Sequence, residues 1–469
     1  MPKTIEAVDG ASSYHPLAHQ SPRRAFDLDD VREASPALEH RRQWFALALI
    51  VLHAILAWHL RAPSITTRID DTTYILLARS LVNHGYQDLF LRGAPLHSQY
   101  PPGYPALLAL LSTIFGERVS IFVIASIILS SLALGFFYLM ARRRWPADIS
   151  LLALAVAAVN PSLVYTAGRI ASEPMFMALT MLALLFLTMT PATGRTLALA
   201  SIAIVAASLT RSIGVTLVAA TGLLWLIERR YKHVLALAAA GVLTIGAWLL
   251  WTVRAPQKFV GRSYIADFTR QGSAPDSPVR ELAYRLMDNA KDYFAHSLPW
   301  IVPWPTIAGT VADNALWLLL DVGLGAVGVW LLWRRHRIAA LALGSYCALL
   351  AIWPWPVARF LFPILPIILL VLLVGAAWLS GRVRWPGVQY APLLFGTLII
   401  GTALSRNAEA ISEALACERD HPLTSPGCFN PDQRSVFAAA EFAKRELPAS
   451  AGIVVAKDAP FGYLTGRQT

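Results

Sequence analysis

Long apolar runs alternate with short polar stretches along most of the chain. The runs fall at about 43–60, 118–140, 148–166, 174–190, 234–252, 314–333, 338–353, 358–379 and 389–404. Several hold roughly 18–25 residues without an interior charge, which is enough for a helix to cross the ~30 Å hydrocarbon core of a bilayer. The pattern therefore predicts an all-α polytopic membrane protein.

The stretch 196–227 can be interpreted as one span or as two. A single helix would be about 46 Å long and would carry Arg211 at its middle. Two shorter spans, with Arg211 in the outer turn between them, place the basic residues that follow 227 on the same side as the other basic clusters. We therefore expect about eleven transmembrane helices.

The net charge of +11 comes with short basic clusters between the apolar runs. These clusters are Arg41/Arg42, Arg142/Arg143/Arg144, Arg229/Arg230/Lys232, Arg334/Arg335/Arg337 and Arg382/Arg384. With eleven spans all five fall on one side, which the positive-inside rule makes cytoplasmic. We expect an integral protein of a bacterial plasma (inner) membrane, with a cytoplasmic N-terminus, an extracytoplasmic C-terminus and no nucleic-acid partner.

Composition agrees with a membrane protein, since 56% of the residues are hydrophobic and 15% are charged, against about 25% charged in a soluble domain. Residues 1–40 are polar and contain no short apolar core with a small-residue cleavage site. They are predicted to form a disordered cytoplasmic tail. The membrane domain is expected over 41–404.

Three segments on the extracytoplasmic side are longer than a simple turn, namely 61–117, 254–313 and 405–469. The first contains "TTYILLARSLVNHG" and "PPGYPALLALLSTIFG", which predict interfacial or re-entrant helices. The second contains the amphipathic stretch "SPVRELAYRLMDNAKDYF".

The third segment changes character, because "RSVFAAAEFAKREL" is typical of a soluble helix and "AGIVVAK" of a short buried strand. Together they predict a small α/β segment, either a lid or an incomplete module that stops at Thr469. Cys417 and Cys428 lie in this outer segment, where a disulfide is chemically permitted, although spacing alone does not decide whether they pair. Cys347 lies within a span and is explained as a small apolar residue.

Ionisable residues from five separate turns share the outer face. They are Asp70, Asp71, Arg169, Glu173, Arg211, Arg254 and Arg359. Charged groups at membrane depth are costly, which makes each of them a functional candidate.

Structural explanations stay open beside the functional ones. Arg254 could snorkel at a helix end. Arg211 could form a structural salt bridge with Glu173, or Glu173 could favour the N-terminus of its own helix. The pair Asp70 and Asp71 could cap the interfacial helix.

The stretches "DDTTY", "PPGYP", "GRIASEPMF", "LTRSIG" and "ARFLFPILP" resemble the GT-C glycosyltransferase superfamily. Within it they are similar to protein O-mannosyltransferases and lipid A aminoarabinose transferases, over about residues 40–405. The resemblance implies a multi-helix membrane domain with an acidic first outer loop. It also implies a sugar donor linked to polyprenyl phosphate.

The resemblance assigns individual residues. Asp70 matches the first acid of the family's Asp-Glu motif, and Asp71 stands where the family usually has Glu. Tyr74 matches the aromatic residue of that motif, and Glu173 resembles the second acidic site. Arg359 resembles the arginine that contacts the donor phosphate.

The expected reaction follows from these assignments. Asp70 is predicted to be the base, assisted by Asp71 and Glu173, and direct attack on the donor would invert the anomeric carbon. Asp71 and Glu173 could instead hold a divalent cation (Mg²⁺ or Mn²⁺); no cofactor is certain. The predicted phosphate ligands are Arg359 and Arg211, followed by Arg254 and Arg169. The predicted sugar or acceptor contacts are Tyr74, His97, Tyr100 and Tyr104.

The expected partners are a polyprenyl-phosphate-linked sugar donor, a lipid, glycan or protein acceptor, and membrane lipids. Cys and His residues show no zinc-site spacing, and no nucleotide-binding fingerprint is present. The alternatives are a transporter or lipid flippase and a non-catalytic scaffold. Against a transporter, the polar residues gather at one rim, whereas transporter sites lie near the midplane.

Overall fold

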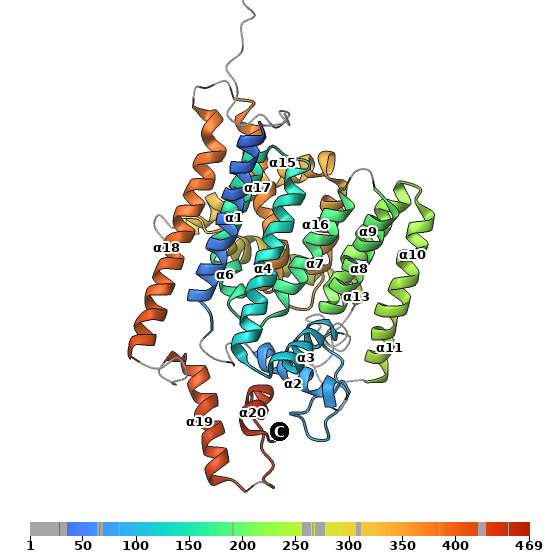
Figure 1. Cartoon of the computed structure of the whole chain (residues 1–469), viewed down its shortest axis with the longest axis vertical. Coiled ribbons are helices and arrows are strands. Elements are labelled where there is room, and N and C mark those ends of the chain that lie inside the picture. Colours follow the sequence, from blue (N-terminus) through green and yellow to red (C-terminus); the bar gives the residue numbers. More distant parts are fainter. Residues whose placement is uncertain are drawn as a thin grey trace, which may run out of the picture.

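The computed structural model describes residues 28, 35–62, 65, 69–83, 85–189, 192–255, 264, 267, 277–305, 311–383, 385, 387–420, 428–448 and 450–469. Most of the tail predicted for residues 1–40 lies outside these ranges. The described chain is a bundle of helices with further helices gathered at one end (Figure 1). The first helix of the bundle, α1 (Pro36–His59), begins after Ser35, whose side chain accepts a hydrogen bond from the backbone N–H of Leu38.

Six helices of the described chain are long and apolar enough to cross a membrane. They are α1, α4 (Val119–Arg142), α10 to α11 (Tyr231–Gly241, then a π-helical turn Val242–Gly246, then Ala247–Arg254), α15 (Val311–Arg335), η4 with α17 (Ala358–Ile364 and Leu365–Ser380), and η5 with α18 (Val388–Tyr390 and Ala391–Asp420). A seventh span is possible if α5 (Ala147–Ala158) and α6 (Pro161–Ala167) are counted together.

The remaining expected spans coincide with four apolar helices that are shorter. They are α7 (Ser172–Leu187), α8 (Gly194–Thr210), η1 with α9 (Ser212–Gly214 and Val215–Ile227), and α16 (Arg337–Ala351). The all-α polytopic architecture is thus confirmed, whereas the number eleven stays a prediction. Helix α8 ends at Thr210 and η1 follows Arg211, so the stretch 196–227 does form two helices.

The expected span 148–166 is broken and bends by 59° between α5 and α6. Asn160 causes the break locally, since its side-chain oxygen accepts from the N–H groups of Ser162 and Leu163 and thereby caps α6. Pro161, at the first position of α6, has no backbone N–H to donate to a carbonyl of α5. Helix α5 therefore cannot continue through it. The side-chain N–H of Asn160 donates to the carbonyl of Ile301 and fixes the corner in the bundle.

The centre of the bundle is the crossing of α15 and α17, where α17 is almost wholly buried. A Cβ on Gly375 would lie 2.2 Å from the carbonyl oxygen of Leu324, and one on Gly328 would lie 2.0 Å from that of Val371. Only glycine allows two helix backbones to approach so closely. The apolar core continues from this crossing into α4, α5 and α7.

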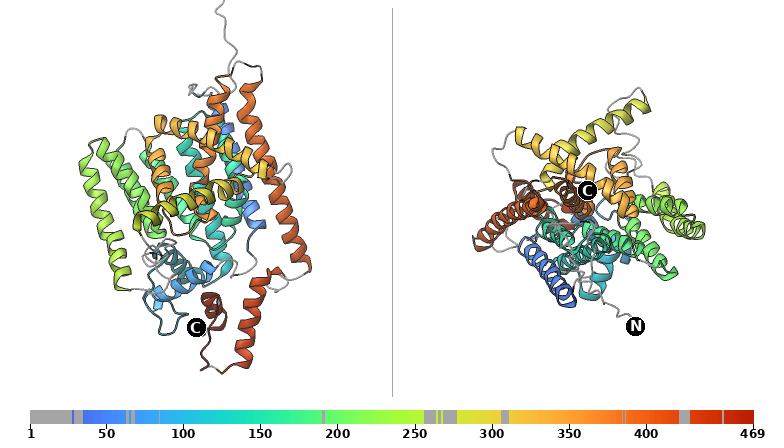
Figure 2. Two further views of the ribbon diagram at one scale, coloured as in Figure 1. Left: turned by 180° about the vertical axis from the view of Figure 1, so that it is seen from behind. Right: turned by 90° about the horizontal axis from the view of Figure 1, so that it is seen from above.

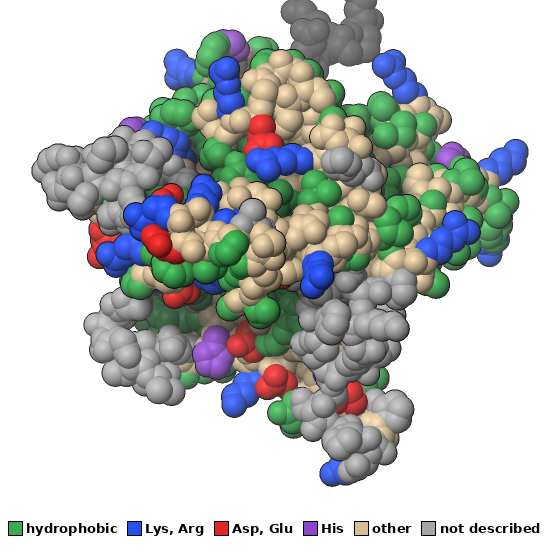
Figure 3. Space-filling model, turned by 90° about the horizontal axis from the view of Figure 1, so that it is seen from below, with side chains coloured by type: hydrophobic (Ala, Val, Ile, Leu, Met, Phe, Trp, Pro, Cys, Tyr) green, Lys and Arg blue, Asp and Glu red, His purple; other side chains and the backbone are tan. Residues whose placement is uncertain are grey.

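Helices α2 (Ile69–Asn83) and α3 (Gly103–Phe115) lie across one end of the bundle, where the sequence predicts interfacial helices (Figures 1 and 2). The described parts of 254–313 form α13 (Pro278–Asp292), η3 (Tyr293–Ser297) and α14 (Leu298–Ile301). The basic clusters lie at the opposite end, because they flank the far termini of α1, α4, α9, α15 and α17. Figure 3 views the end that carries α2 and α3, where acidic and basic side chains lie among hydrophobic ones.

The C-terminal segment differs from its prediction in one element. The expected helix is present as α19 (Pro431–Glu446), capped by Asn430, but "AGIVVAK" forms no strand and leads into α20 (Asp458–Thr465). A single strand needs a neighbour to satisfy its backbone hydrogen bonds, and the described residues offer none. Cys417 and Cys428 form a disulfide that joins the end of α18 to the start of this segment.

Candidate functional site

Asp70 lies in the first turn of α2 and is held by two neighbours. The hydroxyl of Tyr100 donates to its Oδ1 at 2.8 Å, and the guanidinium of Arg359 forms an ion pair with its Oδ2. The Asp70 side chain is 16% exposed, so it keeps access to its surroundings. A carboxylate oxygen has two lone pairs, which leaves Asp70 able to accept a further hydrogen bond.

Glu173 and Arg211 meet from different helices. Glu173 lies in the first turn of α7, where the helix dipole favours a negative charge, and it is only 5% exposed. Arg211 follows the end of α8 and places its Nη1 3.0 Å from the Oε1 of Glu173. The same nitrogen donates to the hydroxyl of Ser172 at 2.8 Å.

Arg359 links the two acids. It lies in η4, a 3₁₀ helix that contains Pro363, and its Nε is 3.9 Å from the Oε1 of Glu173. Asp70, Glu173, Arg211 and Arg359 thus form one cluster, although they come from four segments up to 289 residues apart in the sequence. Of the seven ionisable residues predicted to share the outer face, these four meet in the structure.

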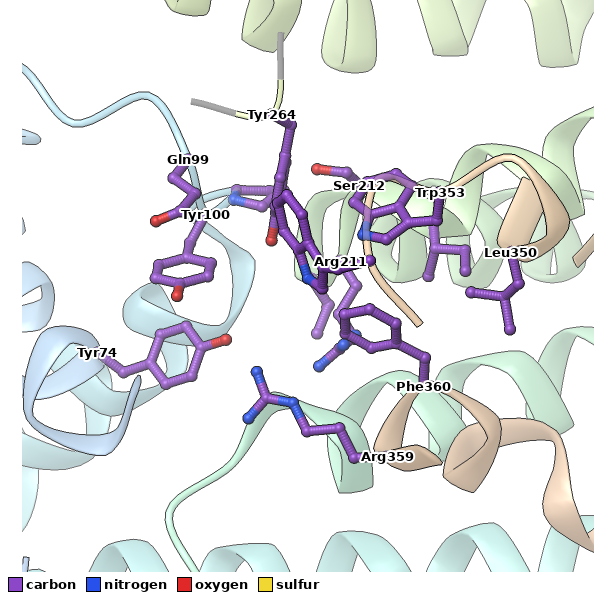
Figure 4. A pocket seen from close by; sticks show the side chains of 14 residues that line it. Tyr74, Gln99, Tyr100, Arg211, Ser212, Tyr264, Leu350, Trp353, Arg359 and Phe360 are labelled. Atoms are coloured by element: carbon purple, nitrogen blue, oxygen red, sulfur yellow. The ribbon is translucent and has the colours of Figure 1, made fainter. Parts of the chain in front are cut away.

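A cavity of about 140 Å³ adjoins the cluster (Figure 4). Arg211, Arg359, Tyr74 and Tyr100 line it, whereas Asp70 and Glu173 are not among its lining residues. The cavity also has an aromatic wall, which comprises Tyr264, Trp353, Trp355 and Phe360. The cavity therefore presents cations and phenol groups, with the two carboxylates next to the arginines.

Tyr74 and Tyr100, which line the cavity beside the arginines, keep their protons. Burial raises the pKa of Tyr100 well above its usual 10, and the nearby Asp70 carboxylate raises it further. Burial likewise raises the pKa of Tyr74, whose hydroxyl lies 3.1 Å from that of Ser172. Both phenols can therefore donate hydrogen bonds at any physiological pH.

Asp71 does not line this cavity, is 2% exposed, and accepts a hydrogen bond from the backbone N–H of Thr72. The described residues contain no group of three or more His, Cys, Asp or Glu side chains placed to hold a metal ion. A divalent cation at Asp71 and Glu173 would need its other ligands from water or the donor phosphate, which Mg²⁺ commonly uses. Such a cation stays a prediction.

Two of the predicted phosphate ligands lie elsewhere. Arg254, at the end of α11, is exposed and does not line the cavity. Arg169 donates to the carbonyls of Tyr165 and Leu60, and its guanidinium stacks on the Tyr165 ring. Arg169 and Glu173 belong to the same turn between α6 and α7. Their side chains nevertheless contact different partners, because the chain changes direction between the two residues.

Two of the predicted sugar contacts are supporting residues. His97 is buried, with its Nδ1 2.7 Å from Asp88, and its Nε2 accepts from the backbone N–H of Tyr100 at 2.8 Å. It therefore positions the loop that carries Tyr100. Tyr104 is 1% exposed and packs edge-on against Tyr74. Neither residue lines the cavity.

Several cavity residues were not predicted, including Gln99, Ser212, Tyr264, Trp353, Trp355 and Phe360. Trp353 follows the end of α16, a position at which interfacial aromatic residues are common in membrane proteins. The stretch "WPWPVARF" offers the one signal that could have found the aromatic wall, since its prolines exclude a regular helix beside Arg359.

No protein-family model matches the sequence, and no curated protein matches it either. Solved structures do resemble the fold. ArnT from Cupriavidus metallidurans, crystallised with undecaprenyl phosphate, aligns with a TM-score of 0.53 and 14% identity over 92% of this chain and 85% of its own.

Archaeal oligosaccharyltransferases also resemble the fold. AglB from Archaeoglobus fulgidus, in complex with an inhibitory peptide and dolichol-phosphate, gives a TM-score of 0.50 with 14% identity over 87% of this chain. An oligosaccharyltransferase from the same organism, tethered to an acceptor peptide, gives 0.51 with 13% identity over 91% of this chain. The present chain spans 58% and 63% of these two proteins. The chain therefore shares the fold of ArnT and of these archaeal oligosaccharyltransferases.

Proposed function

We propose that this protein is a membrane glycosyltransferase that moves a sugar from a polyprenyl-phosphate donor to a lipid, glycan or protein acceptor outside the cytoplasm. The observation that carries the proposal is the cluster of Asp70, Glu173, Arg211 and Arg359 beside one cavity at one end of a membrane bundle. The fold is that of proteins whose structures contain undecaprenyl phosphate or a dolichol-phosphate. We infer eleven spans, a cytoplasmic N-terminus and a location in a bacterial plasma membrane.

The donor phosphate would bind against Arg211 and Arg359, because guanidinium groups match phosphate oxygens in charge and geometry. Both arginines line the cavity while their other contacts hold them to Glu173 and Asp70. The aromatic wall of Trp353, Trp355 and Phe360 would take the apolar face of the sugar or the first part of the prenyl chain.

The reaction would be a single displacement of the hexosyl or pentosyl transfer class. The acceptor oxygen forms a bond to the anomeric carbon while the bond to the phosphate oxygen breaks, and the electron pair leaves on the lipid phosphate. Arg211 and Arg359 stabilise this negative charge. Asp70 accepts the acceptor's proton, and attack from the side opposite the phosphate inverts the anomeric centre.

Binding of undecaprenyl phosphate to the full-length protein in nanodiscs, measured by native mass spectrometry, tests the donor site. We expect Arg211→Gln and Arg359→Gln to weaken binding at least tenfold each, since a hydrogen bond to a charged group contributes about 1.5–3 kcal/mol. Arg254→Gln serves as the matched control, because Arg254 is an outer arginine away from the cavity. Equal binding by all three variants, or no binding by the wild type, would contradict the proposal.

A further inference from the structure

A second cavity of about 360 Å³ lies between the end of α1, the start of α6 and the outer half of α18. It shares no lining residue with the cavity beside Asp70. One face of α18 contributes Arg406, Asn407, Ala410, Glu413 and Cys417, which follow one another at helical spacing.

The cavity is positively charged. Arg61, Arg169 and Arg406 line it, and Glu413 is the one carboxylate among its lining residues. Arg61 donates to the carbonyl of Trp58 at 2.8 Å, and Arg406 donates to the carbonyl of Trp304 at 3.0 Å. Within the described part of the chain no ion pair joins either of these two arginines to a carboxylate. Each guanidinium has five N–H donors, so both retain donors for an anion.

Asn407 indicates that the ligand of this cavity carries a hydrogen-bond donor. Its side chain is 1% exposed, and its Nδ2 donates to the carbonyl of Val159 at 2.7 Å, which fixes the orientation of the amide. Asn407 lines the cavity, and its Oδ1 is buried and receives no hydrogen bond from the described residues. A buried acceptor without a donor costs about 1–3 kcal/mol. A ligand that satisfies it must bring an N–H or O–H group.

The position of the cavity indicates an amphiphile. The lining residue Tyr165 and the nearby Trp58 are aromatic residues of the kind that anchor a protein at the membrane surface. Residues 406–417 follow the apolar run 389–404 on the extracytoplasmic side of α18. In the proposed topology this is the depth at which the headgroups of outer-leaflet lipids lie.

We propose that this cavity binds the headgroup of an outer-leaflet phospholipid, with the phosphate on Arg61, Arg169 and Arg406 and a hydrogen-bond donor on Asn407 Oδ1. An ethanolamine or glycerol headgroup carries both features, and its donor can also reach the carboxylate of Glu413. A choline headgroup has the phosphate but no N–H or O–H donor. The inference stands independently of the transferase chemistry, because it requires only that the protein lies in a membrane.

The test uses the full-length protein in detergent and native mass spectrometry. Short-chain phosphatidylethanolamine, phosphatidylglycerol, phosphatidylcholine and inorganic phosphate are added separately at equal concentrations. We expect the first two lipids to bind at least tenfold more tightly than phosphatidylcholine and inorganic phosphate. The double variant Arg61→Gln/Arg406→Gln should lose this preference, and Arg406→Lys should retain part of the binding because it keeps the charge.

Two controls make the result specific. Arg118→Gln removes an exposed outer arginine outside the cavity and should bind phospholipid as the wild type does. The Arg61→Gln/Arg406→Gln variant should keep its melting temperature within a few degrees and its affinity for undecaprenyl phosphate, which separates this site from the donor site. Equal binding of phosphatidylcholine, equal binding of free phosphate, or full binding by the double variant would each overturn the proposal.

Discussion

At the scale of single residues, the structure assigns different tasks to side chains that look alike in the sequence. Arg211 and Arg359 form ion pairs with carboxylates of the site. Arg169 instead donates to backbone carbonyls, and Arg254 is exposed. The sequence could predict that all four lie near one membrane face, because topology follows from apolar runs and basic clusters. It could not predict their directions, because these depend on the tertiary turns around each residue.

Tyr100 gives a testable case of a supporting residue. Its hydroxyl donates to Asp70, and its backbone N–H is held by His97. Tyr100→Phe removes a hydrogen bond to a charged group worth about 1.5–3 kcal/mol, so we expect kcat to fall about tenfold or more. Initial rates of sugar transfer check this, with the exposed Tyr390→Phe as the control. A variant as active as the wild type would show that Tyr100 does not hold Asp70 for the reaction.

The same phenol also sets an expectation for pH. Because burial and Asp70 raise the pKa of Tyr100, its hydroxyl should stay protonated up to at least pH ~10, the usual pKa of a free tyrosine. We expect no loss of kcat from this group between pH 7 and pH ~10 in the wild type. A decrease in that interval that is absent from Tyr100→Phe would contradict the assignment.

At the scale of elements, helices were easier to predict than their ends or partners. The apolar runs located every expected span as helix, and the amphipathic stretches located α2, α13 and α19. The bend at Asn160 was missed because hydropathy does not register a cap inside an apolar run. The strand expected at 451–457 was wrong because its β-propensity had no neighbouring strand to pair with.

The contact between α3 and α8 positions the arginine side of the site. A Cβ on Gly103 would lie 2.6 Å from the carbonyl oxygen of Leu209, two residues before Arg211. Gly103→Ala should therefore push the two helices apart and destabilise the fold by about 1–3 kcal/mol, as overpacking typically does. We expect a lower melting temperature and weaker binding of undecaprenyl phosphate.

Gly222 in α9 provides the matched control for this substitution, because an added Cβ there meets nothing within 4 Å. Gly222→Ala should leave stability unchanged or raise it slightly, since alanine favours a helix over glycine. If both variants behave alike, the close packing of α3 on α8 does not position Arg211.

At the scale of the whole molecule, the charge pattern separates two ends. The basic clusters lie at one end of the bundle. Helices α2 and α3, with Asp70 in the first turn of α2, lie at the other end (Figure 1). This arrangement could be predicted because the positive-inside rule uses only the positions of Lys and Arg between the apolar runs, which can be found in the sequence. The shape of the cavity could not, because residues from 74 to 360 contribute to it and only tertiary packing brings them together.

Cysteine labelling in intact cells tests the orientation. In a Cys347→Ala background, Ser450→Cys should react with an impermeant maleimide added outside, because position 450 is exposed at the end that carries the site. Lys232→Cys, exposed in the first turn of α10, should react only after the membrane is permeabilised. The reverse pattern would place the acidic cluster in the cytoplasm and contradict the proposed topology.

The most direct measurement compares the wild type with Asp70→Asn in single-turnover release of polyprenyl phosphate from a panel of polyprenyl-phosphate sugars, with an extract of native membranes as acceptor. Asparagine keeps the size of the side chain but cannot take up a proton. The predicted result is donor binding close to that of the wild type and release slowed by about 10²–10⁴-fold, the usual contribution of a general base. Release by Asp70→Asn at the wild-type rate would contradict the assignment of Asp70 and, with it, the proposed mechanism.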